Sequence, residues 1–98
     1  MEISEQINHQ GHIYYLKGRL DAHQVPRLKG QLESVQDTLV LDFAQVNFID
    51  STGLALLVSL YKRAQKTGVP YKIVNVQDQV RVIFEITQLQ TILPIEMG

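Results

Sequence analysis

The 98-residue sequence contains no cysteine. It can therefore form no disulfide, offers no thiolate nucleophile and has no cysteine-ligated zinc site, a composition that fits a reducing cytoplasm. An excess of basic charge is also absent, since nine Lys and Arg residues stand against ten Asp and Glu residues, for a formal net charge of −1. Such a chain lacks the basic field that holds a nucleic-acid backbone, and we expect no nucleic-acid partner.

No apolar run approaches the roughly 20 residues that a membrane-spanning helix needs. The polar, acidic start MEISEQINHQ is unlike a signal peptide. We therefore expect no membrane insertion and a cytoplasmic location. A chain of this length is typical of one domain with one core, and we assign residues 1–98 to a single domain.

The motifs of common catalytic and metal sites are missing from the sequence as well. His9, His12 and His23 show no spacing typical of metal ligands, so we expect no metal site. No glycine-rich phosphate loop is present, which argues against nucleotide enzymes, and we expect no cofactor. Residues 50–53, DSTG, differ from the aspartic-protease triplet by the inserted Thr52 and lack the serine-hydrolase elbow G-x-S-x-G. We expect that the chain is not an enzyme.

The first part of the chain predicts a hairpin followed, after a helix, by a central strand. Strand-like runs at residues 1–7 and 12–18 are separated by NHQG at residues 8–11, a turn-forming sequence, so they are typical of an antiparallel hairpin. Residues 38–43, TLVLDF, are apolar nearly throughout, which indicates a strand that is covered on both faces or lies centrally in a sheet.

Two helices are marked by their end signals. Apolar residues recur at helical spacing after Gln24 or Val25, and Pro26 is tolerated there only in the first turn of a helix. A second helix is predicted over residues 51–67, because basic residues gather near its end and Gly68 follows as a helix-terminating residue.

The remaining elements are a strand, a helix and a short last strand. We predict them at residues 69–76, at residues 78–88 with Asp78 as the cap, and at residues 91–95 with Pro94 at a sheet edge. The order is then β-β-α-β-α-β-α-β. Strands that alternate with helices predict an α/β fold, here a mixed, mainly parallel sheet preceded by a hairpin, with helices packed on it.

One short segment, DSTG at residues 50–53, places an acid and two hydroxyls at the start of the second helix. The simple interpretation is helix capping, because Asp50, Ser51 and Thr52 can all accept hydrogen bonds from the free N–H groups of a first turn. The functional interpretation is a phosphorylation site, because a helix start favours added negative charge. These residues alone leave both interpretations open.

The same helix has an apolar face at helical spacing, formed by Leu54, Leu57, Val58, Tyr61 and Ala64. Leu56 and Leu60 fall outside the centre of this face. Leu56 lies on the side of Thr52 and Arg63, where it would either pack against the helix at 78–88 or belong to a partner-binding patch. We expect the partner-binding patch.

Three stretches together resemble the STAS domain family and, within it, the stand-alone anti-sigma factor antagonists. They are KGRLDAHQVPRLKGQL, LVLDFAQVNFIDSTGLALLVSLYKRA and VRVIFEITQLQTIL, which span most of the chain. In such antagonists the serine that directly follows the Asp is phosphorylated by a partner anti-sigma factor that is itself a kinase, and a phosphatase removes the phosphate. The resemblance implies that this serine is Ser51.

The resemblance also implies a partner-binding surface around Ser51, made of Asp21, Asp50, Thr52, Gly53, Leu54, Ala55 and Leu56. Asp21 and Asp50 would flank the phosphoacceptor. Family members commonly have glycine where Ala55 stands, so a methyl group is added near the docking face, and partner choice is expected to differ. Gln24 replaces the usual Ser or Thr cap of the first helix, and Gln88 replaces a usual glycine after the third.

The function implied is that of a bacterial regulator of transcription that works by partner switching. The unphosphorylated form would bind an anti-sigma factor or serine-protein kinase, phosphorylation of Ser51 would release it, and a serine phosphatase would restore binding. The alternative is a scaffold subunit, like the STAS protein of bacterial lipid-transport ABC systems, that binds an ATPase without a phosphoswitch. The intact Asp50–Ser51 pair favours the switch.

Overall fold

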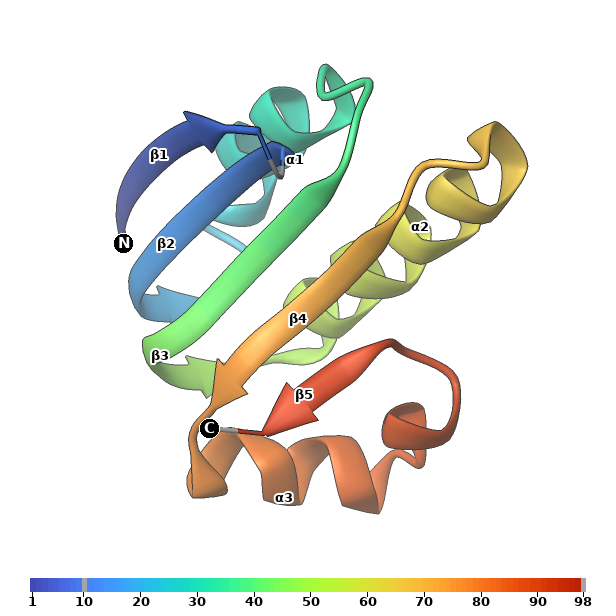
Figure 1. The fold of residues 1–98 in the computed structure, drawn as a ribbon. Helices are drawn as coiled ribbons and strands as arrows, with labels where there is room; N and C mark the ends of the chain where they lie inside the picture. Colours follow the sequence, from blue (N-terminus) through green and yellow to red (C-terminus); the bar gives the residue numbers. More distant parts are fainter. Residues whose placement is uncertain (10, 98) are drawn as a thin grey trace.

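Five strands form one sheet in the order β1-β2-β3-β4-β5 in the computed structural model, which describes residues 1–9 and 11–97 (Figure 1). The strands are β1 (Glu2–Asn8), β2 (Gly11–Leu20), β3 (Leu39–Ile49), β4 (Tyr71–Val76) and β5 (Ile95–Met97). β1 pairs antiparallel with β2, and the other neighbours pair in parallel. The predicted hairpin, mixed sheet and central third strand are confirmed. Gln10, in the predicted turn, lies outside the described residues.

Three α-helices connect the parallel strands: α1 (Val25–Glu33), α2 (Ser51–Thr67) and α3 (Asp78–Ile86). α1 begins directly after Gln24 with proline in its first turn, as predicted. α2 ends at Gly68, whose φ of 76° is the left-handed conformation that glycine adopts without strain. The element order therefore confirms the predicted α/β fold, with the addition of a short 3₁₀ helix, η1 (Leu89–Thr91).

The two faces of the sheet differ. Along β2, Tyr14 and Leu16 are buried in the core, whereas Tyr15 and Lys17 are exposed on the opposite face. α1 and α2 lie behind the sheet in Figure 1, on the side of the buried residues, and the viewer faces the side they leave uncovered. The core contains fully buried side chains of the strands and of the helices, such as Leu41 and Phe43 on β3 and Leu57 on α2.

The C-terminal part differs from the prediction in two respects. Asp78 is the first residue of α3 and not its cap; Gln77 precedes the helix and makes no side-chain capping bond. The strand predicted at residues 91–95 is displaced, because the chain turns through Gln88, at φ 60°, into η1. β5 begins only after Pro94, whose carbonyl accepts a hydrogen bond from β4. Its position at the sheet edge agrees with the prediction.

A helix that crosses a bilayer must be both long and strongly apolar. Within the part of the chain that the structure describes, no helix combines the two properties to the degree that crossing a bilayer requires.

Candidate functional site

The carboxylate of Asp50 joins the start of α2 to the loop that follows β2. Its Oδ1 accepts a hydrogen bond from the backbone N–H of Gly53 at 2.9 Å, and its Oδ2 accepts one from the backbone N–H of Ala22 at 3.2 Å. The backbone N–H of Asp50 donates to the carbonyl of Leu20 at 3.2 Å. Asp50 is therefore the N-cap of α2 and also a bridge between two neighbouring loops.

Gly53 lets α2 approach β2 more closely than any other residue would. A Cβ atom built on it would lie 2.7 Å from the carbonyl oxygen of Leu20 and 2.8 Å from Cγ1 of Ile49. Real Cβ contacts are almost never that short, so the position requires glycine. Gly53 is buried at the entrance of the helix. It supports the surface from beneath and offers little surface of its own for docking.

Asp21 organises the neighbouring loop, which leads from β2 into α1. Its Oδ1 accepts from the backbone N–H of His23 at 3.1 Å, and its backbone carbonyl accepts from the N–H groups of Gln24 and Val25 at 3.0 Å. Because the next residue in the chain bonds to Asp50, the structure brings the two predicted carboxylates to the same end of the sheet. The participation of Ala22 was missed by the sequence analysis, since a backbone donor has no side-chain signature.

The hydroxyls of Ser51 and Thr52 are not needed for capping. Ser51 and Thr52 are exposed, and neither side chain forms a hydrogen bond within residues 1–9 and 11–97. Of the next two predicted surface residues, Ala55 is exposed and Leu54 is half-buried. Asp50 performs the capping, so Ser51 presents an unused hydroxyl at the first position of α2.

Leu56 does not belong to this exposed surface, and the prediction that placed it there is wrong. Its exposed fraction is 3%, as is that of Leu60. Arg63 lies seven residues, or about two turns, after Leu56 and donates to the carbonyl of Val35 at 3.1 Å, directly beyond α1. This side of α2 therefore faces α1, and its apolar surface is wider than the predicted stripe because α2 contacts both α1 and the sheet.

The titratable groups with a shifted pKa lie away from this site. Hydrogen bonds from His12 and Tyr14 lower the pKa of Glu5. Burial, with a smaller effect of Glu5, raises the pKa of Tyr14 to about 12, and burial also raises the pKa of Tyr71. Among the residues described, no group of three or more His, Cys, Asp or Glu side chains could hold a metal ion. The site is thus a surface of exposed hydroxyls and backbone-bonded carboxylates.

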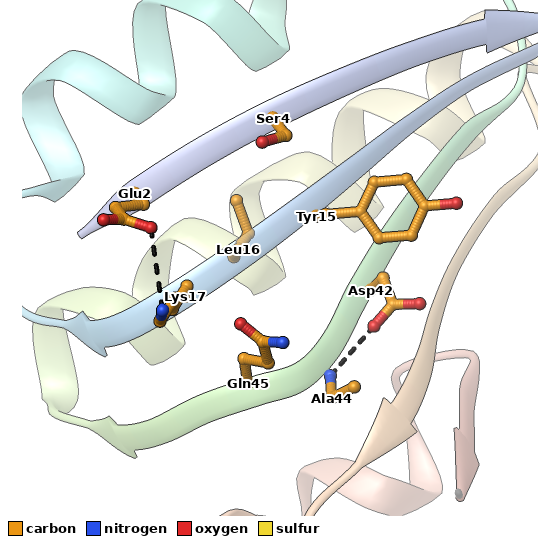
Figure 2. Close-up of a pocket in the computed structure, with 8 residues that line it drawn as sticks. All are labelled: Glu2, Ser4, Tyr15, Leu16, Lys17, Asp42, Ala44 and Gln45. Atoms are coloured by element: carbon orange, nitrogen blue, oxygen red, sulfur yellow. Dashed lines mark hydrogen bonds and ion pairs between the residues drawn. The ribbon is translucent and has the colours of Figure 1, made fainter.

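A concavity of about 470 Å³ lies on the uncovered face of the sheet, away from the start of α2 (Figure 2). It is lined by Glu2, Ser4, Tyr15, Leu16, Lys17, Asp42, Ala44 and Gln45. Its charged groups are paired locally: Lys17 with Glu2 at 3.9 Å, and Asp42 with the backbone N–H of Ala44 at 2.9 Å. None of the predicted site residues lines this concavity.

Comparison with known proteins places these features in context. A family model described as STAS domain matches residues 2–97. The chain is 32% identical over 86 residues to the anti-sigma-B factor antagonist of Listeria monocytogenes, which covers 84% of this chain and 75% of the relative.

Two solved proteins are similar in fold. An anti-sigma factor antagonist from Mycobacterium paratuberculosis matches with a TM-score of 0.84 at 20% identity, covering 99% of this chain and 86% of that one. The anti-sigma factor antagonist SpoIIAA has been solved in an unphosphorylated form and, from Bacillus, in a phosphorylated form. The phosphorylated form matches with a TM-score of 0.76 at 16% identity, covering 99% of this chain and 92% of that one.

Proposed function

This chain belongs to the STAS domain family, and on that premise we propose that it is an anti-sigma factor antagonist controlled by phosphorylation of Ser51. The unmodified protein binds an anti-sigma factor that is also a serine kinase, in the cytoplasm of a bacterium. Phosphorylation of Ser51 by that kinase releases the partner, and a serine phosphatase reverses the modification. The domain itself needs no catalytic residue, because the kinase and the phosphatase carry out both reactions.

The observation that carries the proposal is the exposed, unbonded hydroxyl of Ser51 beside a carboxylate that already caps the helix. A kinase can reach this hydroxyl without opening the fold. The names of the relatives support the anti-sigma factor as partner, and the phosphorylated form of SpoIIAA supports a phosphate on a domain of this fold.

A phosphate at this position has opposite effects on the fold and on the complex. It adds a charge of about −1.5 to −2 at pH 7. The free N–H groups and the dipole at the start of α2 tolerate that charge within the domain. A partner surface that fits a neutral hydroxyl at this end of the sheet, where Asp21 and Asp50 also lie, instead meets a third negative group and must desolvate it. We therefore expect that the fold is kept and the complex is lost.

The experiment is a parallel affinity capture from the source bacterium with wild type, Ser51→Ala and Ser51→Asp as baits. Proteins retained by wild type and lost with Ser51→Asp are identified, purified and measured for affinity. Ser59→Asp is the matched control, because Ser59 is exposed on the same helix about two turns from Ser51. It adds the same charge away from the site and should leave binding unchanged.

Mass spectrometry after incubation with the captured kinase locates the phosphate. We expect it on Ser51 and not on Thr52, and we expect no kinase-dependent labelling of Ser51→Ala. Labelling mainly at Thr52 would refute the assignment. Binding of a transporter ATPase equally to wild type and Ser51→Asp would favour the scaffold function instead.

A further inference from the structure

Arg19 is held in one orientation on the surface beside the site. Its guanidinium carbon lies 3.9 Å from the centroid of the Phe48 ring, and its Nε lies 3.6 Å from Oδ2 of Asp21. Arg19 and Phe48 are direct neighbours in the parallel register of β2 and β3. The Arg19 side chain is nevertheless 61% exposed, so the aromatic ring and the carboxylate fix it without burying it.

The position of Arg19 connects it to the Ser51 site. The following residue, Leu20, accepts the backbone N–H of Asp50, and Asp21 pairs with Arg19 directly. Among the described residues, this is the one ion pair that involves a carboxylate of the site. The guanidinium therefore extends the predicted partner surface onto the uncovered face of the sheet.

The terminal nitrogens of Arg19 differ from those of the other three arginines. Arg27 donates from a terminal nitrogen to the carbonyl of Met1, Arg63 to the carbonyl of Val35, and Arg81 to the carboxylate of Glu85. Arg19 alone makes no hydrogen bond from either terminal nitrogen within the described part of the chain. These N–H groups form the planar fork that matches a carboxylate or a phosphate.

The contacts with Phe48 and Asp21 preorganise the Arg19 guanidinium for binding. Fixing an exposed arginine normally costs side-chain entropy when a complex forms, and that cost is smaller for a side chain already held in place. Stacking on an aromatic ring also leaves the edge of the guanidinium free, since the ring occupies only its flat face. The edge is where a bidentate acceptor would bind.

We propose that Arg19 is a specificity contact that binds an Asp or Glu side chain of the protein partner. This inference rests on the proposed function, because it assumes docking at the Ser51 surface. The carboxylates of Asp21 and Asp50 already accept hydrogen bonds from backbone N–H groups. The terminal N–H groups of Arg19 have no acceptor within the described residues, so this surface offers a partner free donors. A partner carboxylate seated here would also be repelled by a phosphate on Ser51, which strengthens the switch.

The first test measures the affinity of the purified partner for Arg19 variants. Arg19→Gln should weaken binding at least about tenfold, as expected when a charge-assisted pair is lost. Arg19→Lys should recover only part of the affinity, because lysine lacks the planar fork. Arg81→Gln is the control, since Arg81 is engaged with Glu85 on α3, and should bind as wild type does. Unfolding midpoints of all variants show that the fold is kept.

Two results would overturn the inference: wild-type affinity of Arg19→Gln, or tighter binding of Arg19→Glu, which would indicate a basic partner surface. The decisive positive result is rescue. Arg19→Glu should lose binding, and a partner in which one interface Asp or Glu is changed to Arg should restore it.

A second test needs no protein partner and separates the two proposals. The Nε signals of ¹⁵N-labelled arginine side chains are followed while tetraglutamate, or tetraglutamine as a control, is added to the intact protein. The Arg19 signal should shift more than those of Arg27, Arg63 and Arg81, and only with tetraglutamate. If no protein binds the Ser51 surface, the proposed function fails while this readout still tests the carboxylate preference. An Arg19 signal that moves no more than that of Arg81 contradicts the proposed preference of Arg19 for a carboxylate.

Discussion

Helices α2 and α3 both follow a parallel strand of the same sheet, yet their starts are built differently. α2 is capped by Asp50, whose second oxygen reaches the neighbouring loop, and it touches β2 through Gly53. Within residues 1–9 and 11–97, no side chain caps α3, and the side chain of its first residue, Asp78, is 93% exposed and pairs only with Arg81 on its own helix at 3.5 Å. The hydroxyl of Ser51 therefore stands on a junction that is fixed from several directions. The start of α3 is held differently, because the side chains of Gln77 and Gln79 donate to the β3 carbonyls of Ala44 and Asn47 at 2.8 Å and 3.4 Å.

The largest expected effect comes from removing the inner contact of α2. Leu56→Ala should lower the free energy of unfolding by about 2 to 5 kcal/mol, because the side chain is fully packed. Ile86→Ala on α3 should change it by no more than about 0.5 kcal/mol, since that side chain is 73% exposed. Urea denaturation measures both. Similar values for the two variants would remove the contrast between the helices.

The next effect tests the close approach of α2 to β2. Gly53→Ala should destabilise by about 1 to 3 kcal/mol, because the added methyl overlaps backbone and core atoms. Gly30→Ala is the matched control, since a Cβ at Gly30 meets nothing within 4 Å. That change should stabilise by about 0.4 to 1 kcal/mol. A neutral Gly53→Ala would mean that the junction is looser than described.

Removing the acid at each helix start compares the two caps directly. Asp50→Ala should cost about 0.5 to 2 kcal/mol, as is usual for loss of an N-cap. Asp78→Ala should cost no more than about 0.5 kcal/mol, because its ion pair is exposed to solvent. Thermal unfolding followed by circular dichroism ranks the two, and an equal loss would contradict the structural difference.

The smallest effect concerns the stability of the phosphomimetic. Ser51→Asp should stabilise the domain by about 0.3 to 1 kcal/mol through the dipole of α2. Ser59→Asp, in the middle of the same helix, should gain nothing from that dipole. A Ser51→Asp protein that unfolds more easily than wild type would show that loss of binding reflects loss of fold.

Features determined by neighbouring residues were the ones that could be predicted from the sequence. The proline near the start of α1, the Asp50 cap and the terminating Gly68 all follow local rules and are confirmed. Leu56 was misplaced because its burial depends on α1, which contacts α2 from a side that a helical pattern in one segment cannot reveal. Likewise Asp78 resembles a cap in sequence, and only the backbone shows that the helix starts one position earlier.

In the candidate site, too, features set by neighbouring residues could be predicted, and features set by residues distant in the chain could not. Ser51 and its neighbours could be proposed from one motif, because they are consecutive in the chain. The bond from Ala22 to Asp50 and the stacking of Arg19 on Phe48 join residues 28 and 29 positions apart. They arise from the parallel register of β2 and β3, which no local pattern specifies.

The most direct test of the account compares the affinity of the purified partner for unmodified protein and for protein phosphorylated only at Ser51. We expect that the phosphate weakens binding at least tenfold, or about 1.4 kcal/mol, while the unfolding midpoint of the phosphorylated protein is no lower than that of the unmodified protein. Equal affinity of the partner for the two forms would contradict it.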